Sequence, residues 1–386
     1  MTPVIVLSTH NTGLGIIRAL GEIDIPVIAL YYDKADMGYV SKYVIKRYHI
    51  PHPENQINEF IDFLINLSNE FNKSLLLPAD DASLVSVSKK KKLLEKYYNV
   101  ACTDWEITEK FINKFFTYKI AEEAGIPTPR SLLPQSKEDV INFGKKIDYP
   151  CMVKPIHSHL FFDHFRVKMF KVYDYEQLID IYGKIESTDL KVMMQEYIPG
   201  DDTNGVNYNS YFWDQRSIVE FTAEKVRLSP PESGVPCVVV SKEIPEIMEM
   251  GRSILSSMKF YGYSCIEFKK DIRDGVYKLM EVNGRHNRST LLAVKCGINF
   301  AEIQYNHLVK NISINNIKNQ SYEKNIYWID LLKDIVVSVY YLKQKGYTLG
   351  KLLKPYFSKN IFATLNIKDL KPFIKRIFSL LLKIFK

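Results

Sequence analysis

The first feature that limits the fold is a succession of strand, turn, helix and strand at the N-terminus. Residues 4–8 (VIVLS) form an apolar run of strand length, followed by THNTGLG, the helix-like IIRALGEI and a second apolar run, PVIALYYD. Two such runs joined by a helix are typical of the start of a parallel sheet. The alternation continues with helical NQINEFIDFLINLSNEF, strand-like SLLLPADD, a helix around the lysines 89–92, and strand-like NVACTD. We therefore predict an open parallel α/β domain over residues 1–104.

The turn after the first strand leaves two interpretations open. Gly13 and Gly15 have the G-x-G spacing of a dinucleotide-binding loop, and Asp33 ends the second strand where a ribose-binding acid would lie. Arg18 stands where the third glycine of such a loop belongs. The pattern therefore favours a tight turn in an open sheet, with a nicotinamide-dependent oxidoreductase as an alternative.

Composition excludes several classes of protein. The 386 residues, 46% of them hydrophobic, can bury the cores of two or three domains. The sequence has no secretory leader and no apolar run long enough to span a bilayer, so we expect a cytoplasmic protein. Five scattered cysteines without a CxxC pair predict reduced thiols, and neither disulfides nor a zinc site: Cys102, Cys151, Cys237, Cys265 and Cys296.

The net charge of +8 belongs to the end of the chain. Residues 341–386 contain eleven Lys or Arg and one acid, Asp369, whereas the remaining residues have 41 bases and 43 acids. Because the excess charge is confined to this tail, we predict no nucleic-acid partner.

The acids with the most specific spacing lie in two adjacent segments, YSCIEFKKD and YKLMEVNGR. Arg273-Asp274-Gly275 joins the segments and is a strong hairpin-turn signal. Side chains alternate along a strand, so Glu281 and Asn283 share one face, and the hairpin can bring Glu267 beside them. Two carboxylates and an amide oxygen are the hard ligands that Mg²⁺ prefers when it also binds phosphates. The alternative is that Glu267 forms a surface ion pair with Lys269 or Lys278.

Two further strands end in polar residues. Lys154 ends the apolar PCMVK and precedes a proline, which predicts a fixed cation facing a cleft. The segment from Gln195 to Ile198 closes another apolar strand, where exposed peptide groups can pair with the edge of an adenine.

Five segments in order resemble the ATP-grasp superfamily over roughly residues 1–310: NKFFTYKIAEEAGIPTP, PCMVKP, QEYIPG, CIEF and MEVNGR. The resemblance implies an α/β protein with a pre-ATP-grasp domain (1–104) and an α+β ATP-grasp domain (105–310). The latter would have two lobes, about 105–193 and 194–310, and a helical basic extension (311–386) would follow.

The resemblance also implies the following site residues. Lys114 and Lys154 would contact the phosphates of ATP, and Glu267, Glu281 and Asn283 would bind Mg²⁺, with Mn²⁺ as an alternative. Arg285 matches a basic residue near the transferred phosphate, and Lys225 and Arg227 are weaker candidates for the same position. The adenine and the ribose would contact the remaining residues: Gln195, Glu196, Tyr197 and Ile198 for adenine, and Asp202 or Asp201 for ribose.

One segment departs from the family. The loop after Lys154, HSHLFFDHFRVK, lacks the glycines that usually cover the phosphates. Its donors would be Ser158, His159, Arg166 or Lys168, and its three histidines (His157, His159, His164) favour loop contacts over a metal site. This loop, the RLSPPESG segment and the basic tail resemble uncharacterised D-aspartate ligase-like ATP-grasp proteins associated with the cell envelope or polysaccharides.

The function implied is an ATP-dependent carboxylate–amine ligase that uses small-molecule substrates and an acyl phosphate, and acts on an envelope or polysaccharide precursor. The alternative is a non-catalytic nucleotide-binding protein at the membrane surface.

The tail 369–386 has apolar residues at helical spacing interleaved with lysines. Two outcomes are open for it: peripheral contact with an anionic membrane at the cytoplasmic face, or packing on the protein itself. The sequence does not predict an oligomeric state.

Overall fold

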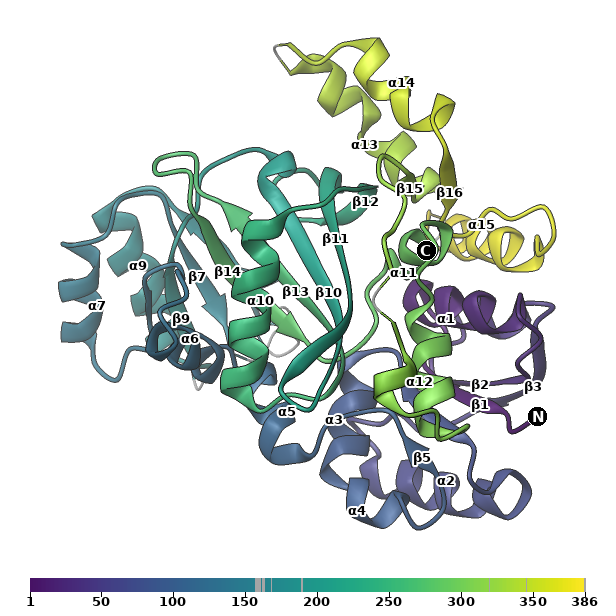
Figure 1. The fold of residues 1–386 in the computed structure, drawn as a ribbon. Helices are drawn as coiled ribbons and strands as arrows, with labels where there is room; N and C mark the ends of the chain where they lie inside the picture. Colours follow the sequence, from purple (N-terminus) through teal and green to yellow (C-terminus); the bar gives the residue numbers. More distant parts are fainter. Residues whose placement is uncertain are drawn as a thin grey trace.

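The structure is a computed structural model that describes residues 1–156, 161, 164–167, 169–188, 190–318, 320–344 and 346–384. Its strands form three sheets, which Figure 1 shows at the lower right, at the left and in the centre. Helices pack against each of them, so the mixed α/β class predicted from the sequence is confirmed.

The N-terminal sheet is parallel, and its strand order is β3-β2-β1-β4-β5. Both β1 and β4 are buried along their whole length because helices cover both faces of the sheet. The strand order reverses between β1 and β4, so the loops after these two strands open into the same crevice. The elements are β1 (Val4–Leu7), α1 (Asn11–Gly21), β2 (Val27–Tyr31), η1 (Gly38–Val40), β3 (Val44–His49), α2 (Ile57–Phe71), β4 (Leu75–Pro78), α3 (Asp81–Lys89), α4 (Lys91–Leu94) and β5 (Asn99–Val100).

The two glycines of the first turn lie inside α1 and serve close packing. A Cβ atom on Gly13 would stand 2.1 Å from the carbonyl oxygen of Ser8, and one on Gly15 would stand 2.6 Å from the Thr290 side chain. Glycine is therefore required here by the approach of α1 to the chain before it and to the neighbouring domain. These contacts account for the G-x-G spacing without a dinucleotide.

The sheet at the left of Figure 1 is antiparallel, in the order β6-β9-β7-β8. Together with α7 and α9 it encloses a small core of its own. Asn113 separates α5 from α6, because its side chain accepts from the N–H of Phe115 and begins a new helix. The elements are α5 (Trp105–Ile112), α6 (Lys114–Glu123), β6 (Ser131–Leu132), α7 (Lys137–Gly144), β7 (Cys151–Pro155), β8 (Phe170–Val172), α9 (Tyr175–Glu186) and β9 (Val192–Glu196).

The central sheet has the order β14-β13-β10-β11-β12-β15-β16. The hairpin expected from the sequence is present as the antiparallel pair of β13 with β14, and β10 pairs with β11 in the same way. Helix α10 lies across one face of this sheet (Figure 1). The elements are η2 (Asp202–Asn204), β10 (Gly205–Trp213), β11 (Arg216–Ser229), β12 (Val235–Ser241), α10 (Pro245–Met258), β13 (Gly262–Lys270), β14 (Tyr277–Asn283), α11 (Thr290–Lys295) and α12 (Phe300–Leu308).

The last part of the chain differs from the purely helical extension expected after residue 310. Two three-residue strands return to the central sheet, β15 beside β12 and β16 beside β15. No described helix of the chain has the length and apolarity needed to cross a membrane. The elements are η3 (Ile314–Asn316), β15 (Tyr327–Ile329), α13 (Leu331–Lys343), α14 (Leu349–Phe357), β16 (Asn360–Phe362) and α15 (Lys371–Ile384).

Buried charges fix α15 to the body of the protein. The guanidinium of Arg18 on α1 lies 3.0 Å from the carboxylate of Asp369, and both side chains are 1% exposed. Arg18 also donates to the carbonyl oxygens of Thr364 and Asp369, and Arg376 on α15 forms an ion pair with Asp330. The beginning of the tail is therefore part of the folded core.

Replacing Asp369 with Asn should be strongly destabilising. The change leaves the buried guanidinium of Arg18 without a counter-charge, which typically costs about 3–5 kcal/mol. The loss is measured as the difference in the free energy of unfolding between the variant and the wild type, from urea titrations. Glu70→Gln is the matched control, because Glu70 pairs with Lys46 at the surface, with both side chains about half exposed. An Asp369 variant as stable as this control would contradict the anchoring role.

Candidate active site

A cavity of ≈ 380 Å³ lies where the N-terminal domain meets the central sheet. The predicted residues Lys225, Glu267, Glu281, Asn283 and Arg285 all line it. The N-terminal domain forms the opposite wall with four residues: His10, Thr12, Asp80 and Asp81. The central part of the chain supplies the remaining ones: Asn207, Val235, Pro236, Cys265, Asn287, Arg288 and Ser289.

The two glutamates stand side by side on neighbouring strands. Glu267 on β13 and Glu281 on β14 are register partners, and Asn283 follows two residues further along β14. The register between β13 and β14 shifts just after Glu267. The spacing in the sequence therefore does bring the two carboxylates and the amide together.

Lysines balance the charge of both carboxylates. The ammonium of Lys225 on β11 lies 2.5 Å from a carboxylate oxygen of Glu267, and that of Lys114 at the start of α6 lies 3.3 Å from Glu281. Burial alone would raise the pKa of Glu267, but the charge and hydrogen bond of Lys225 outweigh burial and lower it. Glu267 is thus paired with Lys225, and not with Lys269 or Lys278, the surface partners that the sequence had left open.

The donor set fits a divalent cation that is also held by phosphates. Within the described ranges, no three side chains among His, Cys, Asp and Glu gather as a closed metal site. Two carboxylates and the amide oxygen of Asn283 leave coordination positions for other oxygens, as Mg²⁺ sites for nucleotides do. The paired lysines show that this corner already stabilises positive charge.

Lys154 lies on β7, where its ammonium donates to the side-chain oxygen of Gln195 on β9. Burial, together with the charge of nearby Lys114, lowers the pKa of Lys154 to about 8. Gln195 in turn donates to Ser131, so the ammonium is held by a defined chain of hydrogen bonds. These hydrogen bonds fix the ammonium, but Lys154 is not among the residues that line the cavity.

The segment after β9 keeps free peptide groups. Among the described residues, the N–H groups of Tyr197 and Ile198 have no backbone partner. The carboxylate of Glu196, in contrast, is occupied, because it accepts from the N–H of Arg130 and from the Arg273 guanidinium. Any contact of Glu196 with an adenine would therefore be made by its main chain.

Two predicted residues lie elsewhere. Arg227 is fully buried, forms a two-point ion pair with Asp334 on α13, and does not line the cavity. Its assignment to the catalytic set is corrected, because its guanidinium fixes α13 to β11. Asp202 accepts from the N–H groups of Leu228 and Glu232 and from the Tyr341 hydroxyl.

The ribose assignment of Asp202 is corrected for the same physical reason, since those three donors occupy its carboxylate. Asp201, the other ribose candidate, caps the turn at Thr203. The predicted loop donors Ser158, His159 and Lys168, and also His157, lie outside the described residues, whereas Arg166 and His164 are exposed.

The arginines after β14 are oriented by acids of other segments. Arg285 forms two hydrogen bonds, of 2.7 and 3.0 Å, with Asp81 of the N-terminal domain. Arg288 donates to Asp330, which also accepts from Asn11 on α1 and Arg376 on α15. Among the described residues, none accepts from the buried Nε of Arg288, so this guanidinium retains a donor.

Sequence reasoning missed the wall contributed by the N-terminal domain. His10 follows β1, and Asp80 and Asp81 follow β4. These positions are the carboxyl ends of adjacent parallel strands, where the crevice of an open α/β sheet forms. His10 accepts from the N–H of Thr12 at Nδ1, so its neutral ring presents an Nε2–H. The strand ends were the signal that could have identified them.

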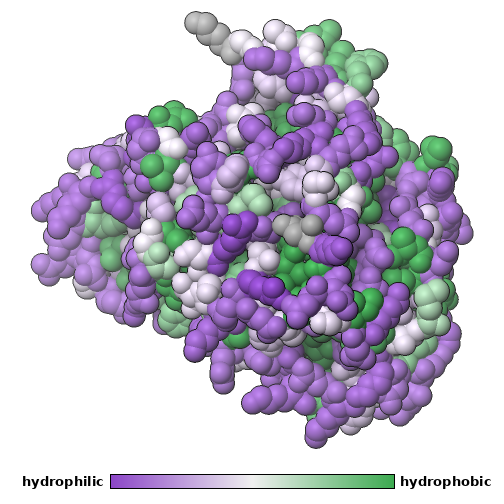
Figure 2. All heavy atoms as spheres, in the orientation of Figure 1, coloured by the Kyte–Doolittle hydropathy of each residue, from purple (hydrophilic) through white to green (hydrophobic). Residues whose placement is uncertain are grey.

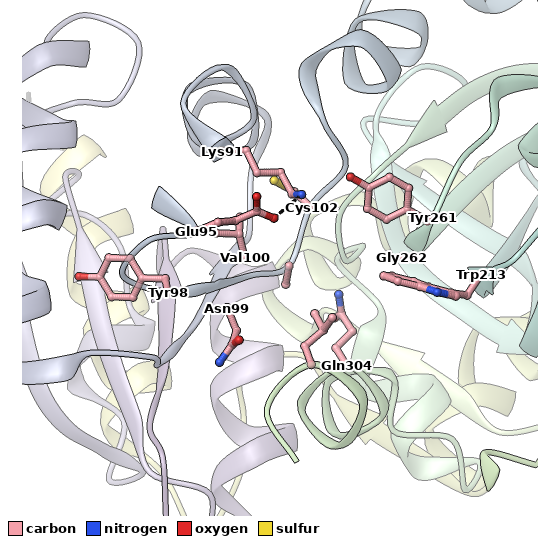
Figure 3. Close-up of a pocket in the computed structure, with 12 residues that line it drawn as sticks. Lys91, Glu95, Tyr98, Asn99, Val100, Cys102, Trp213, Tyr261, Gly262 and Gln304 are labelled. Carbon is pink, nitrogen blue, oxygen red and sulfur yellow. Dashed lines mark hydrogen bonds and ion pairs between the residues drawn. The ribbon is translucent and has the colours of Figure 1, made fainter. Parts of the chain in front are cut away.

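A second cavity, of ≈ 280 Å³, lies between β5 and the central sheet. Figure 3 shows Lys91 and Glu95 directed toward each other on one side of it, with Tyr261 and Trp213 on the other. None of the predicted site residues lines it, and Lys91 is paired with both Glu95 and Asp104. We therefore place the candidate active site in the first cavity.

Known proteins share this architecture. The structure of L-amino acid ligase from Bacillus licheniformis superimposes with a TM-score of 0.62, at 15% identity, over 83% of this chain and 78% of that one. Biotin carboxylase from Campylobacter jejuni gives a TM-score of 0.65, at 14% identity, over 83% and 74%. The chain has the ATP-grasp fold. The order of motifs predicted this ATP-grasp fold correctly.

Two curated proteins resemble this ATP-grasp chain in sequence. D-aspartate ligase of Enterococcus faecium is 27% identical over 259 residues, which cover 63% of this chain and 61% of the relative. D-alanine–D-alanine ligase of Pseudomonas fluorescens is 22% identical over 211 residues, which cover 50% and 60%. The chain thus spans about three fifths of the length of these relatives. No model of a protein family matches it.

The Lys225→Met variant tests the candidate cation site. The change leaves Glu267 opposite Glu281 without its ammonium partner, so we expect a loss of about 1–3 kcal/mol at neutral pH. The pKa of Glu267 should then rise above its unfolded value, and lowering the pH toward it should restore stability. Added Mg²⁺ should raise the melting temperature of the variant more than that of the wild type.

The matched control is Lys242→Met, because Lys242 pairs with Glu224 on the same sheet but outside the cavity. Thermal unfolding with and without MgCl₂ gives both readouts. Equal responses of the two variants to Mg²⁺ would argue against a cation site at Glu267 and Glu281.

Proposed function

We propose that this protein is an ATP-dependent carboxylate–amine ligase that forms an amide through an acyl phosphate. The observation that supports this best is the facing pair of Glu267 and Glu281, with Asn283 beside it, in a cavity that a second domain closes. The cationic side chains of Lys225 and Arg285 lie in the same cavity. A site for nucleotide phosphates and a divalent cation thus opens onto a separate wall for substrates.

The reaction has two steps. A carboxylate oxygen of the first substrate attacks the γ-phosphorus of ATP, the bond from that phosphorus to the β–γ bridging oxygen breaks, and ADP leaves. The amine of the second substrate then attacks the carbonyl carbon, gives up a proton, and inorganic phosphate leaves. Neutralising the transferred phosphoryl group and positioning the reactants provide most of the acceleration. No Ser or Cys nucleophile is needed.

The nucleotide would lie between the left and central sheets of Figure 1. The Tyr197 and Ile198 main chain would contact adenine, and Lys114 and Lys154 the phosphates. Glu267, Glu281 and Asn283 would hold Mg²⁺, or Mn²⁺ in its place. When bound, the cation would neutralise charge on the phosphates.

The substrates would face the N-terminal wall. Arg285, held by Asp81, and Arg288, with its open donor, would stabilise the oxyanion that forms as the amine attacks. Small-molecule carboxylates and amines fit a cavity of ≈ 380 Å³. The likeness to D-aspartate ligase and D-alanine–D-alanine ligase supports an amino acid as one of them. The other would be a cell-envelope or polysaccharide precursor.

ADP release from Mg-ATP tests the proposal. We expect pooled D- and L-amino acids with envelope precursors to stimulate release, and splitting the pools to identify the substrate pair. Glu281→Gln and Lys154→Ala should each lower the stimulated rate by about 100-fold or more, because both act on the charge of the transferred group.

Glu224→Gln is the control, since Glu224 lies on β11 and pairs with Lys242 outside the cavity. Stimulation that persists in the Glu281 and Lys154 variants would refute the site. If Mg-ATP binds but no pool stimulates ADP release, the non-catalytic nucleotide-binding alternative is favoured instead.

The affinity for ATP should depend on the charge of Lys154. Its pKa of about 8 means that the ammonium of the free protein loses its proton as the pH rises from 7 to 9. The phosphates favour the charged form, so the Kd of Mg-ATP should rise by up to about tenfold over this range. Titration calorimetry measures it. In Lys154→Arg, which keeps its charge, the Kd of Mg-ATP should depend less on pH. An unchanged pH dependence in this variant would mean that another group causes it.

A further inference from the structure

The hairpin of α13 and α14 projects from the top of the molecule in Figure 1. Its inner side is fixed to the body of the protein. Val337 and Tyr341 on α13 and Leu352 on α14 are buried, and Asp334 on α13 forms the buried ion pair with Arg227. The orientation of the hairpin is therefore set by the core, and so is the side that it turns to solvent.

The outer side of the hairpin is also apolar. On α13, the exposed side chains include Ile335, Val336 and Val339; on α14, they form a stripe at a spacing of four residues, Leu349, Leu353 and Phe357. Val336 is 78% exposed and Phe357 is 85% exposed. Figure 2 shows hydrophobic side chains gathered at this end of the molecule. Helices that are apolar on both sides normally have a partner on each, and a contiguous patch of this kind marks an interaction surface.

The charge of the hairpin segment indicates what kind of partner its outer side can bind. Residues 335–368 contain six lysines and no acid. Lys343, Lys351 and Lys354 are exposed among the apolar side chains, whereas Lys359 is paired with Glu323 at the base of the hairpin. Two copies of this surface would bring their lysines together, so self-association through it is opposed. Apolar side chains surrounded by lysines match the surface of an anionic bilayer, with its acyl boundary below phosphate groups.

We propose that the outer side of the α13–α14 hairpin is a peripheral docking surface for anionic phospholipid bilayers. Exposed apolar side chains would enter the boundary between headgroups and acyl chains, and the lysines would contact the phosphates. The sequence pattern left membrane contact open for the tail, residues 369–386. The surface proposed here lies in a different segment. The inference does not depend on the proposed ligase activity.

Flotation of the 386-residue chain with lipid vesicles tests the surface. We expect binding to vesicles of phosphatidylglycerol and phosphatidylcholine, little binding to phosphatidylcholine alone, and weaker binding as salt is raised. Val336→Asp and Phe357→Asp should each lower the bound fraction at least about tenfold, since each replaces an apolar side chain that would enter the bilayer by a carboxylate that the anionic lipid repels. Both side chains are exposed, so folding should be unaffected.

Two further variants decide between segments. Ile367→Asp is the matched control, because Ile367 is 86% exposed but lies outside the hairpin, and it should bind like the wild type. Phe378 on α15 is 61% exposed, and the Phe378→Asp variant tests whether the tail binds the membrane. Loss of binding in the Phe378 variant alone would overturn the proposal, as would absence of binding to phosphatidylglycerol. So would a wild-type dimer that Val336→Asp or Phe357→Asp converts to a monomer, because the surface would then join two copies.

Discussion

Glu267 and Glu281 stand directly opposite each other on β13 and β14, and their negative charges repel. Two adjacent carboxylates are stable in a partly buried site only if positive charge is supplied close by. Lys225 from β11 and Lys114 from α6 supply it, one for each glutamate. Four separate segments must therefore be assembled for this corner to exist, and its preference for positive charge follows from the register of a single hairpin.

The site walls depend on a second set of charge pairs. Asp81 of the N-terminal domain holds Arg285, and Asp330 holds Arg288. Asp330 is completely buried and also accepts from Asn11 and Arg376, so it joins α1, the cavity and α15 at one carboxylate. Breaking the pairs of Asp330 would leave a buried charge, whereas Asp81 is 55% exposed and its pair with Arg285 contributes less.

Much of this could be predicted from the sequence where the signal is local. Arg273-Asp274-Gly275 fixes a tight turn, and the alternation of the flanking strands then determines which acids share a face. Four strands of the parallel sheet were equally predictable from their apolar runs, whereas the edge strand β3 is mostly exposed and was not predicted. The order of five short motifs was sufficient to identify the fold.

What could not be predicted depends on contacts across long stretches of chain. The family resemblance made Arg227 a candidate site residue, but its partner, Asp334, is 107 residues away. The same applies to Asp202, whose partner Tyr341 is 139 residues away. Strands β15 and β16 have three residues each, too few for a periodic pattern, and they become strands only because the edge of an existing sheet accepts them.

Helix α1 connects the cavity to the C-terminal part of the chain, which limits how the N-terminal domain can be exchanged. Its 11 residues form a rod about 16 Å long, with the cap His10 at the cavity and Arg18, near the other end, enclosed by residues 363–369. A chimera that exchanges the N-terminal domain with that of a distant homologue would therefore replace one wall of the cavity and, in the same step, remove Arg18, the counter-charge of Asp369. Modular shuffling of the first domain should succeed only when the tail is transferred with it.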